Sequence, residues 1–286
     1  SGTIAHAVLR RGGGEACGGR SALTTPMRLM YERRAFLLTA AVHPFLQRSL
    51  QVSAGECAFR SPVLGSVYSL VANHVVQGRV IFPAAGYLEL ASAAVCSSNT
   101  STPVAGLQHV FFVRPFAVEM PGLHIECGVA LGRFEVRSSD ADADTPEGAA
   151  ELHCSGAVAP SRSDDTWMHI DHASVRSYSC THAADVSTLY ATFDTSGLQY
   201  GPGYRTLENA WAGGVACLRR RPTQQCTQVH PADLDDAFCT GVLCANGGSG
   251  GGGSEGNECR LPFAVDGVLQ QGAPGRLWAA VGRQEG

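Results

Sequence analysis

The stretch 83–97, PAAGYLELASAAVCS, decides the fold of this chain. Pro83 suits the first position of a helix, where its missing N–H breaks no hydrogen bond. Apolar side chains follow on nearly every side, a pattern typical of a helix that is buried all round. Because segments of strand-like composition flank this helix, we predict an α+β domain in which an antiparallel sheet wraps around it.

Strands are predicted from β-branched and aromatic residues and from period-two alternation. In the first half of the chain they cover residues 65–76, 78–82, 107–118, 122–131, 132–139 and 150–159. Their even spacing and the polar turn DADADTPEG at 140–148 indicate an antiparallel meander.

The second half of the chain repeats this plan. Residues 186–197 and 233–245 have the composition of short helices, and strand-like segments surround them. Two halves of this kind form an internal repeat at the level of architecture. The predicted organisation is an N-terminal tail at 1–38, a first half at 39–160, a connection at 161–185, and a second half at 186–286 with a flexible Gly/Ser-rich loop at 246–257.

The composition excludes several classes of protein. Of the 286 residues 16% are charged, and the net charge of −4 does not favour binding to nucleic acid. No apolar run reaches the roughly 18 residues needed to span a membrane. The 11 cysteines lack a C-x-x-C pair, which is typical of free thiols in a reducing intracellular compartment, the cytoplasm or a plastid. His169 and His172 form H-x-x-H without a third ligand, so we predict no metal site.

His74 is the first candidate for catalysis. Gly78 follows four residues later and permits a close backbone approach, and Pro83 then begins the buried helix. Amides at a helix N-terminus stabilise a carbonyl oxygen that gains negative charge. A neutral imidazole beside them is suited to removing a proton α to that carbonyl. A lone histidine at a strand end is more often structural, and the residues alone leave both interpretations open.

A carboxylic acid would complement such a base, and Asp235 in HPADLDD is the candidate. An aspartate near the start of a helix commonly serves only as its N-cap. Asp233 and Asp236 lie beside it, and their spacing does not select among the three.

The stretch YGPGY at 200–204 is the third informative motif. Gly201 and Pro202 enforce a tight turn beside Tyr200. A tight turn with aromatic packing explains this composition. A turn that positions a catalytic loop also explains it.

These three motifs, in this order, resemble the dehydratase domain of polyketide synthases. Members carry H-x-x-x-G-x-x-x-x-P, which His74, Gly78 and Pro83 match. They carry Y-G-P-x-F, matched by residues 200–204 with a tyrosine in the last position, and H-P-x-x-L-D, matched by residues 230–235. Other stretches that resemble the family are HPFL at 43–46, ELHCSGAV at 151–158 and LPFAVDGV at 261–268.

The resemblance covers roughly residues 40–286 and implies a double hotdog fold, in which each half is a sheet wrapped around a helix. The implied activity is elimination of water from a β-hydroxyacyl thioester, giving the α,β-unsaturated acyl thioester. The substrate is delivered on the phosphopantetheine of an acyl carrier protein, so no cofactor is implied in the domain itself. The implied partners are that carrier protein and neighbouring synthase domains, and the sequence leaves open whether the domain forms a homodimer.

The family pattern also implies roles for individual residues. His74 would remove the α-proton, and Asp235 would protonate the leaving hydroxyl. The amide of Gly78 or its surroundings, together with Pro83 at the helix start, would support the thioester carbonyl. The residues implied to shape the pocket are Tyr200, Gly201, Pro202 and Cys239.

Two residues depart from the family pattern. Members usually have glutamine or histidine four residues after the acid, where this chain has Cys239, and commonly an aspartate where it has Asn73. A thiol is a poor substitute for an amide or an imidazole in hydrogen bonding. Besides an active dehydratase, two functions therefore stay open: a related double hotdog enzyme, such as a product-template or cyclase domain or a double-bond isomerase, and a catalytically impaired scaffold.

Overall fold

The computed structural model describes residues 43–53, 56–98, 105–119, 122–140, 150–159, 175, 177, 180, 182–241, 261–270 and 277–281. All of them belong to one structural unit, residues 39–286. The predicted tail at 1–38, the predicted loop at 246–257 and most of the predicted connection at 161–185 lie outside the described residues.

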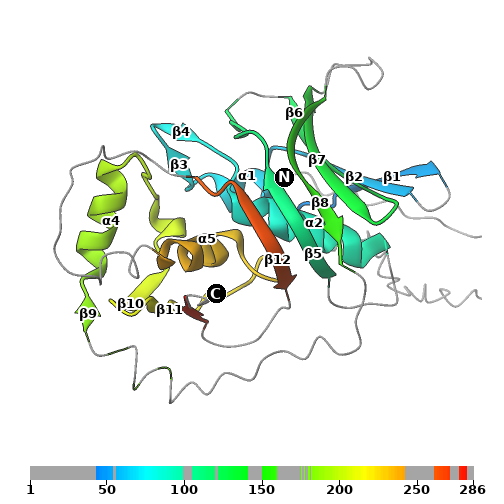
Figure 1. The fold of residues 1–286 in the computed structure, drawn as a ribbon. Coiled ribbons are helices and arrows are strands. Elements are labelled where there is room, and N and C mark those ends of the chain that lie inside the picture. The colour runs from blue at the N-terminus through cyan, green and yellow to red at the C-terminus, as the bar shows by residue number, and fades with distance from the viewer. Residues whose placement is uncertain are drawn as a thin grey trace, which may run out of the picture. The chain divides into compact units, whose positions relative to one another are not determined.

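A seven-stranded antiparallel sheet dominates the first half (Figure 1). Its strand order is β1-β2-β6-β7-β8-β5-β12. The strands are β1 (Arg48–Ser53), β2 (Glu56–Pro62), β5 (Ala105–Phe112), β6 (Leu123–Ala130), β7 (Arg133–Asp140), β8 (Glu151–Val158) and β12 (Ala264–Gln270). Burial alternates along β7, where Phe134, Val136 and Ser138 are buried, so one face of the sheet packs on the core.

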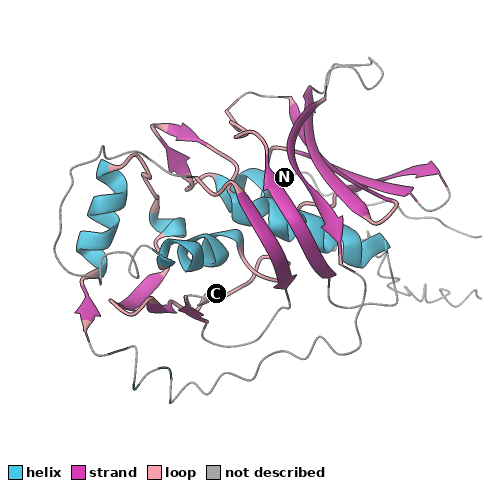
Figure 2. Ribbon diagram, viewed as in Figure 1, coloured by secondary structure: helices cyan, strands magenta, loops and turns pink. Residues whose placement is uncertain are grey.

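Helix α2 (Ala84–Ser98) packs against this sheet, chiefly on β5 and β6 (Figure 2). Every residue from Ala85 to Val95 is buried. The carbonyl of Pro83 accepts the Gly86 N–H at 2.9 Å, so the helix begins directly after the proline. A Cβ at position 86 would lie 2.7 Å from the Phe82 ring, which explains the glycine. The predicted buried helix at 83–97 is confirmed.

The prediction of a strand over 65–76 is wrong for most of its length. Residues Ser66–Val71 form helix α1, and the hairpin of β3 (Val75–Val76) and β4 (Arg79–Val80) follows. Val67, Leu70 and Val71 are buried at helical spacing on one face of α1. Burial of this apolar stripe outweighs the strand preference of valine and tyrosine.

The second half contains a four-stranded antiparallel sheet in the order β13-β11-β10-β9. The strands are β9 (Ala183–Ala184), β10 (Leu207–Trp211), β11 (Val215–Leu218) and β13 (Trp278–Ala280). The helices are α4 (Val186–Thr195), the 3-10 helix η1 (Pro202–Tyr204) and α5 (Pro231–Cys239). Helix α5 begins earlier than its predicted start because the His230 side chain accepts the Ala232 N–H and caps it.

Two features join the halves. Strand β12 belongs to the second half in sequence, yet it pairs with β5 at the edge of the seven-stranded sheet. Glu89 of α2 is fully buried and accepts the N–H groups of Gln228 at 2.5 Å and Val229 at 3.2 Å. Its carboxylate also lies 3.0 Å from His43 Nε2. The two hydrogen bonds from Gln228 and Val229 fix α2 relative to the segment that leads into α5.

Candidate active site

A cavity of about 680 Å³ is lined by residues from both halves, including α2, α4, α5 and the segment before β12. Its wall is largely apolar. Phenylalanine rings at positions 82, 112, 193, 238 and 263 contribute to it. A cavity of this size and character suits an acyl chain, because apolar walls exclude water and leave the few polar groups to orient the ligand.

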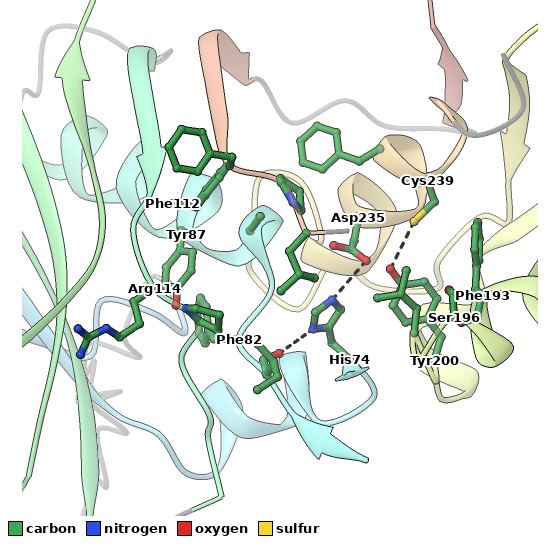
Figure 3. A pocket seen from close by; sticks show the side chains of 18 of the residues that line it. His74, Phe82, Tyr87, Phe112, Arg114, Phe193, Ser196, Tyr200, Asp235 and Cys239 are labelled. Carbon is green, nitrogen blue, oxygen red and sulfur yellow. Dashed lines mark hydrogen bonds and ion pairs between the residues drawn. The ribbon is translucent and has the colours of Figure 1, made fainter. Parts of the chain in front are cut away.

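His74 lies between α1 and β3 and faces this cavity (Figure 3). Only 4% of its surface is exposed. Its Nδ1–H donates to the Ile81 carbonyl at 2.7 Å, which leaves Nε2 unprotonated in the neutral ring. The imidazole also packs beside the rings of Tyr200 and Tyr204, at 5.6 and 5.4 Å between centroids. The fold therefore presents a fixed, basic nitrogen to the cavity.

Asp235 lies on α5 and points toward His74 (Figure 3). Its Oδ2 is 3.7 Å from His74 Nε2. That distance is too long for a hydrogen bond, and Oδ2 is a buried oxygen with no hydrogen-bond partner among the described residues. The structure thus brings together the two residues that the sequence singled out, one from each half.

The other two aspartates of this helix have different surroundings. Asp233 accepts the Nε–H of Arg221 at 2.7 Å. Asp236 accepts hydrogen bonds from Tyr190 and from Thr206. Neither aspartate lines the cavity, whereas Asp235 does. This placement selects Asp235 from the three aspartates, which their spacing in the sequence could not do.

Tyr200 and Cys239 both line the cavity. The Tyr200 hydroxyl is 3.3 Å from Cys239 Sγ (Figure 3). Burial, and then the negative charge of Asp235, raise the pKa of Tyr200 above its ordinary value. Tyr200 is therefore a protonated hydrogen-bond donor beside the carboxyl of Asp235.

Gly201 and Pro202 lie behind the cavity wall rather than in it. The Gly201 N–H donates to the Asn73 carbonyl at 2.8 Å, and the Gly203 N–H donates to Asn73 Oδ1 at 3.2 Å. A Cβ at position 201 would lie 2.2 Å from that same Oδ1, so only glycine permits this approach. The turn thereby fixes Tyr200 against the residue next to His74.

Gly78 lies in the turn between β3 and β4, with a φ of 77°. Its N–H donates to the side chain of Gln199 at 2.7 Å, and Gly78 does not line the cavity. A direct role for the Gly78 amide toward a thioester carbonyl gains no support from this placement. Pro83 does not line the cavity either, but Ala84, the first residue of α2, does. The N-terminal end of α2 therefore opens onto the cavity.

Sequence reasoning did not identify Tyr87. It lies in the first turns of α2, lines the cavity and is 3% exposed. Its hydroxyl has no hydrogen-bond partner among the described residues. A tyrosine on the all-apolar face of a buried helix was the available signal, because buried phenols usually require a partner.

Asp236 is almost fully buried, and its ionisation should affect stability. Its Oδ2 accepts three hydrogen bonds, from the Thr206 N–H at 2.5 Å, the Thr206 hydroxyl at 2.6 Å and the Tyr190 hydroxyl at 2.9 Å. Burial outweighs these bonds and raises the pKa of Asp236 from 3.8 to about 7. Because the folded state binds this proton more tightly than the unfolded state, stability is lost as pH rises from about 4 through about 7.

We expect Asp236→Asn to relieve this loss. The asparagine oxygen can accept the same three bonds, and its amide replaces Oδ1, which has no partner among the described residues. Relative to wild type, the variant should gain on the order of 4 kcal/mol of unfolding free energy between about pH 4 and pH 8, because it does not titrate. Urea unfolding across this range measures the difference. The exposed Asp266→Asn is the control, and a pH-independent difference for Asp236→Asn would contradict the expectation.

No group of three or more His, Cys, Asp or Glu side chains within the described ranges is placed to hold a metal ion. His169 and His172 lie outside those ranges. Among the same residues, no helix is long and apolar enough to cross a membrane.

Two family profiles match the chain. The profile described as polyketide synthase dehydratase domain matches residues 43–138. The profile described as polyketide synthase dehydratase N-terminal domain matches residues 170–285. The two matches cover both halves of the fold and include His74 and Asp235.

Similar curated proteins are polyketide synthases. ThaG of Burkholderia thailandensis is 29% identical over 275 residues, which cover 91% of this chain and 5% of ThaG. PksM of Bacillus subtilis is 25% identical over 269 residues, which cover 87% of this chain and 6% of PksM. The chain thus spans about a twentieth of the length of these relatives.

Solved dehydratase domains of the curacin polyketide synthase share the fold. The CurK domain is 22% identical with a TM-score of 0.69, and the match covers 82% of this chain and 86% of that one. The CurJ domain is 18% identical with a TM-score of 0.69 and 83% coverage of each chain. Two CurK variants, one with a histidine replaced by phenylalanine and one with an aspartate replaced by asparagine, are described as inactive. The predicted double hotdog is confirmed, and with both profiles matched this chain belongs to the dehydratase domains of polyketide synthases.

Proposed function

We propose that this domain removes water from a β-hydroxyacyl thioester on an acyl carrier protein, giving the α,β-unsaturated acyl thioester. One observation carries the proposal: His74 Nε2 and Asp235 Oδ2 face each other at 3.7 Å in a largely apolar cavity. The α-hydrogen and the β-hydroxyl of the substrate are on neighbouring carbons. A base and an acid this close together can act on both groups of one bound acyl chain.

His74 is the base in this proposal. Its Nδ1–H is held by the Ile81 carbonyl, so Nε2 is the atom that takes the α-proton. Removal of that proton places negative charge on the thioester oxygen. The N-terminal amides of α2, beside Ala84, precede the first intrahelical hydrogen bonds and are oriented to stabilise such charge.

Asp235 is the acid. Hydroxide is a poor leaving group near neutral pH, so the β-oxygen must be protonated as its bond to carbon breaks. The Asp235 carboxyl supplies this proton and becomes a carboxylate. The leaving group departs as water. Tyr200, a protonated donor beside that carboxyl, stabilises the resulting negative charge. General acid and general base catalysis each contribute typically about 10²–10⁴ in rate.

The chemistry of this pair requires only proton transfers, and we propose that the domain binds no cofactor of its own. The phosphopantetheine of the carrier protein is part of the substrate. The relatives are far longer than this chain, which supports neighbouring synthase domains as further partners.

A synthetic β-hydroxybutyryl thioester of N-acetylcysteamine tests the function. We expect the product to lose the mass of one water and to gain the ultraviolet absorbance of a conjugated enoyl thioester. The butyryl thioester is the matched control and should show neither change, because it lacks the β-hydroxyl. Migration of a double bond in an enoyl substrate without dehydration would instead indicate an isomerase, and binding without turnover would indicate a scaffold.

A further inference from the structure

Cys239 lies one helical turn after Asp235, on the same face of α5. It lines the same cavity, and its Sγ is 3.3 Å from the Tyr200 hydroxyl (Figure 3). The family usually has glutamine or histidine at this position, and neither of those side chains is a comparable nucleophile for soft carbon. This chain therefore places a thiol at the acid side of the proposed reaction centre.

Two buried polar atoms indicate that the cavity beside this thiol takes a ligand. The Asp235 side chain is 9% exposed, and its Oδ2 has no hydrogen-bond partner among the described residues. Tyr87 is 3% exposed, and its hydroxyl likewise has no partner among them. Both residues line the cavity, so a bound molecule could supply the hydrogen bonds that these two atoms lack among the described residues.

We propose that Cys239 is a covalent modification site for α,β-unsaturated acyl thioesters, adding through its sulfur to their β-carbon. This inference rests on the proposed function, which makes such a thioester the product. The β-carbon whose hydroxyl is protonated by Asp235 and departs as water must lie near that carboxyl. Cys239, on the next turn of the same helix, then lies near the electrophilic carbon.

The addition balances with the protonation states that dehydration leaves behind. His74 then carries the proton taken from the α-carbon, and Asp235 is a carboxylate. Asp235 accepts the proton of the Cys239 thiol as the sulfur forms its bond to the β-carbon. The π electrons of the C=C bond move to the α-carbon, which takes the proton from His74 Nε2. The result is a thioether and a saturated acyl thioester, with no oxidant or reductant consumed.

Incubation with crotonyl-N-acetylcysteamine thioester, followed by intact mass and peptide mapping, tests the proposal. We expect one adduct on the peptide that contains Cys239. It should form roughly tenfold or more faster than an adduct at the exposed Cys226, because the cavity holds the electrophile beside the sulfur. Saturated butyryl thioester should slow labelling of Cys239 by competition, and Cys226→Ser should leave it unchanged.

The variant Cys239→Ser should form no adduct on this peptide, and mapping of the wild-type protein decides the result even if that variant folds poorly. Equal labelling of both cysteines, labelling that ignores the butyryl competitor, or no adduct at Cys239 would each overturn the proposal. The β-hydroxybutyryl assay on the same preparation separates this failure from failure of the proposed function. Dehydration without the adduct rejects the modification site alone, and an adduct without dehydration supports the site while rejecting the dehydratase.

Discussion

Replacing His74 with phenylalanine is expected to lower the rate of dehydration by roughly 10²–10⁴-fold, the usual contribution of a general base. Phenylalanine keeps an aromatic ring beside Tyr200 and Tyr204, so the packing of the cavity wall should survive. What is lost is Nε2, the atom proposed to take the α-proton. The measurement is kcat/KM for the β-hydroxybutyryl thioester.

Exchange of the substrate α-hydrogen with solvent deuterium provides a second readout. It should disappear in His74→Phe, since it needs only the base and not the acid. The control is His182→Ala, at an exposed histidine outside the cavity, which should retain the wild-type rate. Turnover of His74→Phe within about threefold of wild type would remove His74 from the mechanism.

Replacing Asp235 with asparagine is expected to cause a loss of similar size, roughly 10²–10⁴-fold, for a different reason. Asparagine matches the size of the carboxyl and can still face His74, but it cannot donate an acidic proton to the leaving hydroxyl. The exposed Asp266→Asn makes the same chemical change on β12, away from the cavity, and should have no effect on turnover.

A substrate with a better leaving group separates the roles of the two residues. In a β-fluoroacyl thioester the fluoride departs without prior protonation. Asp235→Asn should therefore recover much of its lost activity on this substrate, while His74→Phe should not, because the α-proton must still be removed. Equal losses on both substrates for Asp235→Asn would show that the carboxyl positions the ligand and does not protonate it.

The sequence predicted the central helix and the meander because the residues of each element themselves indicate whether it is buried. Residues 83–97 are apolar on nearly every side, and a helix of that kind is stable only when it is buried. Helix α1 was missed because its valines and tyrosine favour strands, while the core it covers is contributed by segments far along the chain. In α1, burial against distant segments outweighed the strand preference of its residues, and the local sequence contains no sign of that burial.

The candidate site was predicted only in part, for a similar reason. His74 was identified from its own motif, but spacing could not separate Asp235 from its two neighbours. The separation comes from Arg221, which holds Asp233, and from Thr206 and Tyr190, which hold Asp236. None of these partners can be assigned to an aspartate without the fold. The phenylalanines of the cavity wall are likewise ordinary core residues when considered in sequence alone.

The return of β12 to the first sheet has a consequence for engineering chimeric synthases. A recombination boundary within residues 161–185 would supply β5 from one parent and β12 from another, although these strands share a continuous ladder from Ala105–Gln270 to Phe111–Ala264. Mismatched parents would leave a long strand edge open, which invites aggregation. Functional hybrids should therefore exchange this region as an undivided cassette, with both crossovers placed outside residues 43–281.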